Sequence, residues 1–172
     1  YYNKTIATDD DITVGSVGVP RTLTVSKLKK SGVAFLNNWA CPTCSPTRAS
    51  LFTGMYAHRH GITDPSLSDG FTDGGYTTVA QELGAAGYAT AIFGKWHLGE
   101  ASGHGPVDNG WDLHQGFLGG AVDSYYDWDR VDSSTGLTSA CTTYAPTQTV
   151  TDALAWIKKQ PGRWMATVAL NA

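Results

Sequence analysis

Residues 78–99 read TVAQELGAAGYATAIFGKWHLG and place a helix signal directly before a strand signal. Thr78 with Gln81 three positions later resembles a capping box, which predicts a helix over residues 79–86 that the following glycine ends. Residues 88–93 then read as a β-strand that runs into a glycine-flanked loop. The stretch therefore predicts one helix–strand unit with a loop at the carboxyl end of the strand.

The same order of signals occurs on both sides of this unit. Toward the N-terminus, residues 22–30 have helical spacing and precede the apolar run 33–36, which suits a buried strand. Toward the C-terminus, residues 150–160 predict a helix, and residues 164–170 predict a strand after a Pro-Gly stop. Residues 99–146 predict loops with short strands. Helix followed by strand three times indicates an α/β fold with a mainly parallel sheet flanked by helices.

Composition limits the classes of function. With 172 residues, 41% of them hydrophobic and 16% charged, the chain suits one globular domain without an internal linker. Its net charge of -3 offers no basic face, which argues against nucleic acid as a partner. No apolar run reaches the roughly 18 residues of a transmembrane helix. The compartment stays open, with the periplasm or secretion favoured, and the oligomeric state is not predicted.

The run CSPTRASLFTG, residues 44–54, joins a nucleophile to the start of a helix. Pro46 suits the first helical turn, so Cys44 falls at or just before the N-terminus, where free amides and the helix dipole favour an anion. Arg48 lies one turn further on the same face and adds a fixed cation. These positions predict an anion-binding site that contains a nucleophile.

Two further groups of residues carry chemistry. Lys95 and His97 lie in the loop after the predicted strand, and both point into one site if this loop is extended. Taken singly, each is an ordinary surface lysine or core-edge histidine. Asp9, Asp10 and Asp11 follow a β-prone run at the start of the chain. Adjacent carboxylates indicate either a bound cation or a solvated acidic turn.

These segments together resemble the signature of the type I sulfatases. The resemblance consists of Cys-x-Pro-x-Arg at 44–48, Thr53-Gly54, the continuation Tyr56, His58 and Gly61, and Gly-Lys-Trp-His-Leu-Gly at 94–99. The chain is similar to the N-terminal part of a formylglycine-dependent, arylsulfatase-like member of bacterial type. The resemblance implies an alkaline-phosphatase-like fold, with residues 1–172 as the N-terminal part of the catalytic domain.

The resemblance also implies a cofactor, a partner enzyme and a role for each candidate residue. A maturation enzyme reads the Cys-x-Pro-x-Arg core and oxidises Cys44 to formylglycine, whose hydrate attacks the sulfur of a sulfate-ester substrate. Asp10 and Asp11, with the matured residue 44, bind Ca²⁺ or another divalent cation such as Mg²⁺. The resemblance assigns the contacts with the sulfate and with formylglycine to Arg48, Lys95 and His97. Family members continue well beyond this length and supply further ligands, so 172 residues alone are expected to be inactive.

Several alternatives stay open. Cys41 and Cys44 form a Cys-x-x-Cys pair, but a zinc site needs a second ligand pair and Cys141 stands alone in the sequence. A Cys41–Cys141 bond is not settled by the sequence. A phosphonate or phosphodiester hydrolase of the same superfamily uses the same groups, and a non-catalytic relative keeps only the scaffold.

Other polar residues are read as structural first. His58 lies inside the family-like stretch, whereas His60, His104 and His114 have no such context and suit ordinary structural roles. The sequence also holds an acidic aromatic cluster, made of Asp123, Tyr125, Tyr126, Asp127 and Trp128. Such a cluster suits either the lining of a substrate cleft or packing in the core or a loop.

Overall fold

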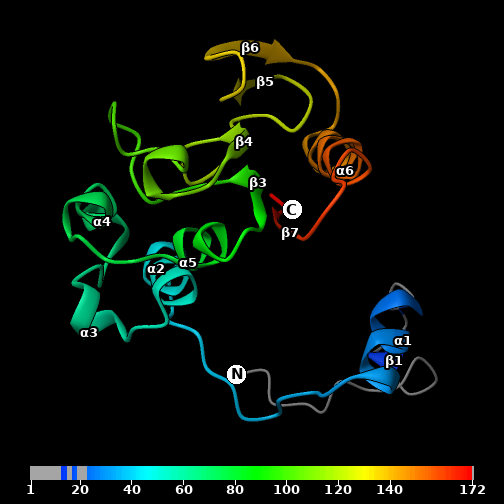
Figure 1. The fold of residues 1–172 in the computed structure, drawn as a ribbon. Helices are drawn as coiled ribbons and strands as arrows, with labels where there is room; N and C mark the ends of the chain where they lie inside the picture. Colours follow the sequence, from blue (N-terminus) through cyan, green and yellow to red (C-terminus); the bar gives the residue numbers. More distant parts are fainter. Residues whose placement is uncertain (1–12, 15–16, 19–22, 172) are drawn as a thin grey trace. The chain divides into compact units, whose positions relative to one another are not determined.

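The computed structural model describes residues 13–14, 17–18 and 23–171, which belong to two compact units (Figure 1). The first unit lies within Tyr1–Ala40 and the second within Cys41–Ala172. In the first, β1 (Thr13–Val14) pairs antiparallel with β2 (Val17–Gly18), and α1 (Leu23–Ser31) follows. The helix predicted over residues 22–30 is therefore confirmed.

The strand predicted over residues 33–36 is wrong. These residues form no strand, and the side chains of Val33, Phe35 and Leu36 are 81%, 83% and 71% exposed. A short apolar run signals a preference for burial only, and a strand also needs a neighbour to hydrogen-bond with. Within the described residues, no strand pairs with this segment.

A five-stranded mixed sheet forms the centre of the second unit, in the order β6-β5-β4-β3-β7. The central strand β3 (Ala89–Lys95) runs parallel to β4 (Leu113–Phe117) on one side and to β7 (Trp164–Ala169) on the other. The strands β5 (Trp128–Asp132) and β6 (Leu137–Cys141) continue the sheet antiparallel. The predicted α/β class is confirmed, and the parallel part of the sheet is its β4-β3-β7 half.

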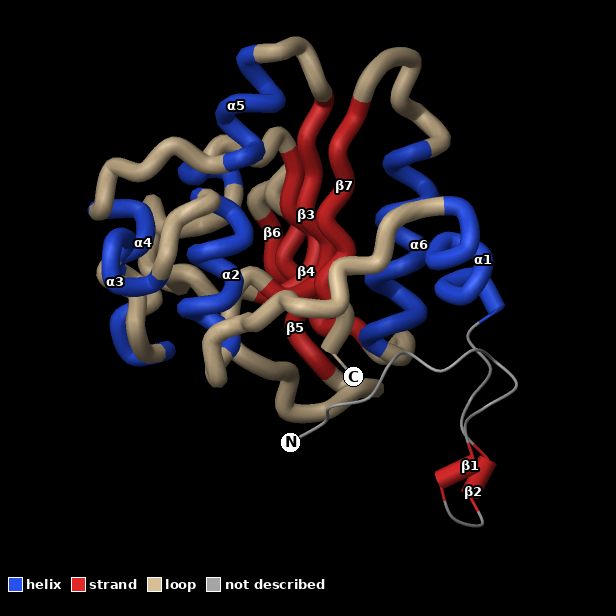
Figure 2. The backbone as a smooth tube through the Cα atoms, turned by 90° about the horizontal axis from the view of Figure 1, so that it is seen from below, coloured by secondary structure: helices blue, strands red, loops and turns tan. Residues whose placement is uncertain are grey.

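Helices cover both faces of this sheet. The helices α2 (Cys44–Thr53) and α5 (Val79–Ala85) lie on one side, and α6 (Ala145–Ile157) lies on the other (Figure 2). Shorter helical turns are α3 (Ala57–His60), η1 (Pro65–Leu67), α4 (Gly70–Asp73) and η2 (Val107–Asn109), and α3 and α4 lie on the α2 side (Figure 2). Among the described helices, none has both the length and the apolar character needed to cross a membrane.

Two of the helix predictions can be compared with these bounds. The capping box before α5 is present, because Gln81 N–H donates to Thr78 Oγ1 at 3.2 Å and Thr78 N–H donates to Gln81 Oε1 at 2.8 Å. Helix α6 begins at Ala145, five residues before its predicted start, because Pro146 suits the first turn of a helix.

Alternate residues of β3 pack on opposite faces of the sheet, as the twofold repeat of a strand requires. Ile92 joins the core under α2 and α5, whereas Ala91 and Phe93 join the core under α6 with Ala153. The first core also holds stacked and edge-on aromatic rings, which come from Phe52, Phe71, Trp96 and Trp111. Burial on both faces explains why β3 reads as an almost continuous apolar run.

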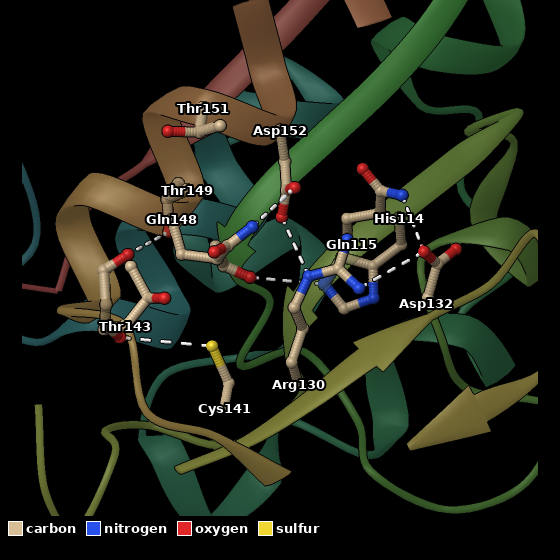
Figure 3. A network of polar contacts seen from close by, with 12 residues as sticks. His114, Gln115, Arg130, Asp132, Cys141, Thr143, Gln148, Thr149, Thr151 and Asp152 are labelled. Carbon is tan, nitrogen blue, oxygen red and sulfur yellow. Dashed lines mark hydrogen bonds and ion pairs between the residues drawn. The ribbon is translucent and has the colours of Figure 1, made fainter. Parts of the chain in front are cut away.

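A polar network joins β4 and β5 to α6, on the face of the sheet that α6 covers (Figure 3). Arg130 Nε donates to Asp152 Oδ2 at 2.8 Å, and Arg130 Nη1 lies 3.3 Å from Asp132 Oδ2. Gln115 Nε2 donates to Asp132, and Gln148 Nε2 donates to Asp152. The carboxylates of Asp132 and Asp152 thus accept hydrogen bonds from arginine and amide donors. These bonds stabilise their negative charges at a place that is partly shielded from water.

Candidate active site

The N-terminus of α2 and the carboxyl end of β3 bring Cys44 and His97 together. Cys44 is the first residue of α2, and its Sγ lies 3.0 Å from His97 Nδ1. The next residue adds a second link, because Ser45 Oγ donates to the His97 carbonyl at 2.9 Å. The predicted position of Cys44 at a helix N-terminus is confirmed, and its partner comes from a loop 53 residues further along the chain.

Arg48 ties the same two segments together from one turn further along α2. Its Nε donates to the Trp96 carbonyl and its Nη2 donates to the Lys95 carbonyl. Burial lowers the pKa of Arg48 to about 10, while the neighbouring Cys44 acts in the opposite direction. The guanidinium therefore stays charged at neutral pH, and these two bonds use only part of its five N–H donors.

His97 has an unusual backbone and a neutral ring. Its φ is +55°, a left-handed value that few non-glycine residues adopt, and its N–H donates to the Leu118 carbonyl at 2.8 Å. Burial lowers the pKa of His97, and the charges of Lys95 and Arg48 lower it further. A neutral imidazole beside Cys44 can accept a proton, which a protonated one cannot.

Lys95 is the last residue of β3 and is half-buried. Its positive charge contributes to the lowered pKa of His97, which is two residues further along the chain. Four residues predicted from the sequence thus meet at one end of the sheet, and they are Cys44, Arg48, Lys95 and His97.

Sequence reasoning missed two residues that shape this site. Ser45 holds the His97 backbone, as described above. Gly120 faces the His97 ring so closely that a Cβ built on it would lie 2.8 Å from Cε1 and Nε2. The pair Gly119-Gly120 is the one signal in the sequence for such a close approach, because glycine is the residue that leaves this space.

The predicted metal ligands Asp10 and Asp11, and their neighbour Asp9, lie outside the described residues. Within residues 13–14, 17–18 and 23–171, no group of three or more His, Cys, Asp or Glu side chains is arranged to hold a metal ion. The three cysteines are all free thiols, so Cys41 and Cys141 are not bonded to each other. The Cys-x-x-Cys segment therefore shows no zinc-like cluster in the described part of the chain.

The remaining histidines fall into different environments. His58 is exposed and stacks on Tyr56 with ring centroids 5.9 Å apart. His60 is buried, and its two ring nitrogens contact Ser50 Oγ and the Ile62 N–H. His104 Nδ1 lies 2.7 Å from the Asp69 carbonyl oxygen. The ring that contacts Cys44 is that of His97, and the partners of His60 and His104 agree with structural roles for these two residues.

A cavity of about 480 Å³ lies beside the loop that follows β4. Its wall includes Leu118 and Gly119, which directly precede the glycine that faces His97. Carboxylates and aromatic rings supply most of the rest, from Glu100, Phe117, Asp123, Asp127, Trp128 and Asp129. Part of the acidic aromatic cluster seen in the sequence thus lines a cavity, although Trp128 itself is 95% buried and its Nε1 donates to the Thr143 carbonyl.

Comparison with known proteins gives one family. A family model described as Sulfatase matches residues 7–172. Arylsulfatase G from Rattus norvegicus is 37% identical over 122 residues, which cover 66% of this chain and 23% of that protein. N-acetylgalactosamine-6-O-sulfatase from Bacteroides thetaiotaomicron is 38% identical over 109 residues, which cover 59% of this chain and 21% of that protein. The chain thus spans less than a quarter of the length of these curated relatives.

Solved structures agree on the fold. The crystal structure of Ps i-CgsB has a TM-score of 0.66 and 26% identity, with 76% of this chain and 35% of that chain covered. A protein solved in complex with its substrate D-glucosamine-2-N,6-O-disulfate has a TM-score of 0.61 and 26% identity. The match covers 77% of this chain and 25% of that chain.

Proposed function

The chain belongs to the Sulfatase family, and we propose from this premise that the protein hydrolyses sulfate esters with a nucleophile made from Cys44. The observation that carries the proposal is the 3.0 Å contact between Cys44 Sγ and His97 Nδ1, at a helix N-terminus and beside two cationic side chains. A nucleophile, a neutral base and fixed positive charge are the groups that attack on an anionic ester requires. Their location beside the carboxyl end of the parallel strand β3 supports the proposal, because α/β sheets carry their sites at this edge.

We propose that a maturation enzyme recognises Cys44, Pro46 and Arg48 and, with an external oxidant that it supplies, oxidises the Cys44 side chain to the aldehyde of formylglycine with loss of the sulfur. The hydrated aldehyde carries two hydroxyls on one carbon. One hydroxyl attacks sulfur and the alcohol leaves, and the second then loses its proton as the C–O bond to sulfate breaks, which restores the aldehyde. An unmodified serine or cysteine has no second hydroxyl and would leave a sulfated enzyme that water must attack.

The described side chains have distinct roles in this proposal. His97, neutral because its pKa is lowered, accepts the proton of the attacking hydroxyl. Arg48 and Lys95 stabilise the negative charge that develops on the sulfate oxygens, an effect for which removal of one donor costs roughly 10²–10³ in rate. The Lys95→Ala variant is therefore expected to lose most of its turnover.

Asp10 and Asp11 are the proposed ligands of a divalent cation, Ca²⁺ or Mg²⁺, together with residue 44. Carboxylate oxygens suit these hard cations, whereas a thiol does not, so the ligand set fits the metal once residue 44 carries oxygen. A bound cation would supply Lewis-acid polarisation of the sulfate.

Two other functions make different predictions. A formylglycine-dependent phosphonate or phosphodiester hydrolase would share the modification but prefer phosphorus esters. A non-catalytic relative would keep an unmodified Cys44. The relatives carry names for aryl and amino-sugar sulfate chemistry, which supports a sulfate ester as the substrate class and leaves the alcohol undefined.

Peptide mass spectrometry of the fragment that contains position 44 tests the nucleophile. Conversion of the thiol to the aldehyde is expected to lower the peptide mass by about 18 Da. The sulfate and phosphate esters of one phenol then separate the reaction classes, with Cys44→Ala as the control. An unmodified thiol in protein from its natural source, or faster hydrolysis of the phosphate ester, would contradict the proposal.

A further inference from the structure

The backbone at Gly94 bends where β3 ends, and the space around it is very small. Gly94 has a φ of +87°, and a Cβ built on it would lie 2.1 Å from the Ala169 carbonyl oxygen of β7. On the other side, a Cβ on Gly116 of β4 would lie 2.1 Å from the Gly94 carbonyl oxygen. The glycines therefore permit this bend, and the pairing of β3 with β4 and β7 holds the strand on both sides, but glycine itself adds no preference for one orientation of the Gly94 peptide.

His114 adds a side-chain contact to the carbonyl of this peptide. His114 lies on β4, is 1% exposed, and has its Nε2 3.2 Å from the Gly94 carbonyl oxygen. A carbonyl oxygen only accepts hydrogen bonds, so Nε2 carries the proton and donates. Burial lowers the pKa of His114 to about 4, against the opposing effect of this hydrogen bond. The imidazole is thus neutral at neutral pH and remains in the tautomer that this contact needs (the ring is labelled in Figure 3).

The three residues after Gly94 carry the contacts of the candidate site. The carbonyls of Lys95 and Trp96 both accept hydrogen bonds from Arg48. His97, next along the chain, contacts Cys44. A rotation of the Gly94 peptide would therefore displace the backbone groups that hold Arg48 and the ring that faces the nucleophile.

We propose that His114 is a positioning residue for the reaction at Cys44, acting through its hydrogen bond to the Gly94 carbonyl. This inference rests on the proposed function for its consequence in catalysis, but its geometric part applies equally to the unmodified thiol. His114 touches neither the nucleophile nor the substrate in this account. It fixes the orientation of the strand end from which Lys95 and His97 extend.

A pair of amide variants isolates the hydrogen bond. In His114→Gln the side-chain amide reaches the position of Nε2 and can still donate to Gly94, whereas in His114→Asn it is one methylene shorter and cannot. Thr90→Val is the matched control, because Thr90 is fully buried at the opposite end of β3 and loses bonds to Asp112 and Gly110. His114→Asn and Thr90→Val each remove buried hydrogen bonds, so general softening of the fold affects both of them, whereas His114→Gln keeps the bond to Gly94.

The first readout is the rate at which iodoacetamide alkylates Cys44 in the full-length protein produced without the maturation enzyme, followed by peptide mass spectrometry. The thiolate is the form that reacts, and His97 can accept the thiol proton of Cys44, so displacement of His97 in His114→Asn is expected to lower this rate by about tenfold. His114→Gln and Thr90→Val are expected to stay within about threefold of the wild type.

The second readout is turnover of a sulfate ester by the matured protein. His114→Asn is expected to lower kcat with little change in KM, and His114→Gln to restore kcat. Equal rates for the Asn and Gln variants, or an equal loss in Thr90→Val, would overturn the positioning role. If the alkylation rates follow the prediction but the wild type hydrolyses no sulfate ester, the positioning role stands and the proposed function fails.

Discussion

At the scale of single residues, the candidate site depends on small side chains that leave room for larger ones. His97 adopts a left-handed backbone and has Gly120 against its ring. A side chain at position 120 would therefore displace the imidazole that contacts Cys44. Such a contact links residues 23 positions apart, which explains why no local motif in the sequence reports it.

The variant Gly120→Ala is predicted to lower turnover by tenfold or more, because its Cβ would lie 2.8 Å from two atoms of the His97 ring and a displacement of about 1 Å costs up to roughly 100-fold. The measurement is kcat for a sulfate ester, with thermal unfolding recorded alongside. Gly119→Ala is the control, since its Cβ would lie 3.4 Å from Glu100 Oε1, the end of a flexible side chain. Equal activity in the two alanine variants would refute the argument.

The sequence predicted the reacting groups better than it predicted their surroundings. Cys44, Arg48, Lys95 and His97 belong to short motifs whose chemistry is legible from residue type and spacing. Ser45 and His114 act through single hydrogen bonds to backbone carbonyls 52 and 20 residues away. Nothing in the sequence around them marks these partners, because they become neighbours only when β3, β4 and α2 have packed.

At the scale of helices and strands, local signals succeeded where they were complete. The capping box before α5 contains both of its hydrogen bonds, and the helix follows as predicted. The apolar run at residues 33–36 indicated burial, but it has no neighbouring strand to hydrogen-bond with among the described residues, and it forms no strand. Helix α6 started early because its first turn is set by Pro146, whereas the apolar spacing used for prediction begins later.

Thr78→Val tests how much the cap of α5 contributes to the free energy of unfolding. Thr78 is 1% exposed, and its hydroxyl donates to the Asn109 carbonyl at 2.7 Å while accepting from Gln81 N–H. Valine keeps the shape but removes both bonds, so a loss of about 2–3 kcal/mol is expected from the missing cap and the unsatisfied carbonyl. Urea unfolding measures it.

The neighbouring Thr77→Val is the control for that variant, because Thr77 is exposed and has the same chemistry. Its effect on the free energy of unfolding is expected to stay within about 0.5 kcal/mol, as is usual for surface positions. A comparable loss in both variants would show that the reduced stability does not come from the cap.

At the scale of the whole molecule, the fold places its chemistry where parallel strands end. The predicted α/β class held because the alternation of helix and strand around β3 and β7 is strong in the sequence. The antiparallel strands β5 and β6 arise from the segment with weak periodicity, where only short strands were predicted. Contacts that join this part of the sheet to the rest of the unit, such as Arg130 with Asp152 of α6, are not local in the chain.

The metal proposal applies to the intact protein and predicts a stability effect that needs no substrate. A ligand that binds only the folded state at about 100 times its Kd stabilises it by roughly 2.7 kcal/mol, so Ca²⁺ is expected to raise Tm by several degrees. Asp10→Asn and Asp11→Asn are expected to remove this rise, and chelation with EDTA should reverse it in the wild type. Asp9→Asn, the adjacent carboxylate, is the matched control and should keep it.

The state of residue 44 sharpens this test. Because Ca²⁺ prefers oxygen to sulfur ligands, the rise in Tm should be larger for protein that carries formylglycine than for protein that retains the Cys44 thiol. Comparing the two forms at one Ca²⁺ concentration therefore asks whether the modified residue belongs to the same ligand set as the aspartates. An identical rise in Tm in both forms would place residue 44 outside the metal site while leaving Asp10 and Asp11 in it. An equal rise in Tm for Asp9→Asn, Asp10→Asn and Asp11→Asn would remove the aspartate pair from the site as well.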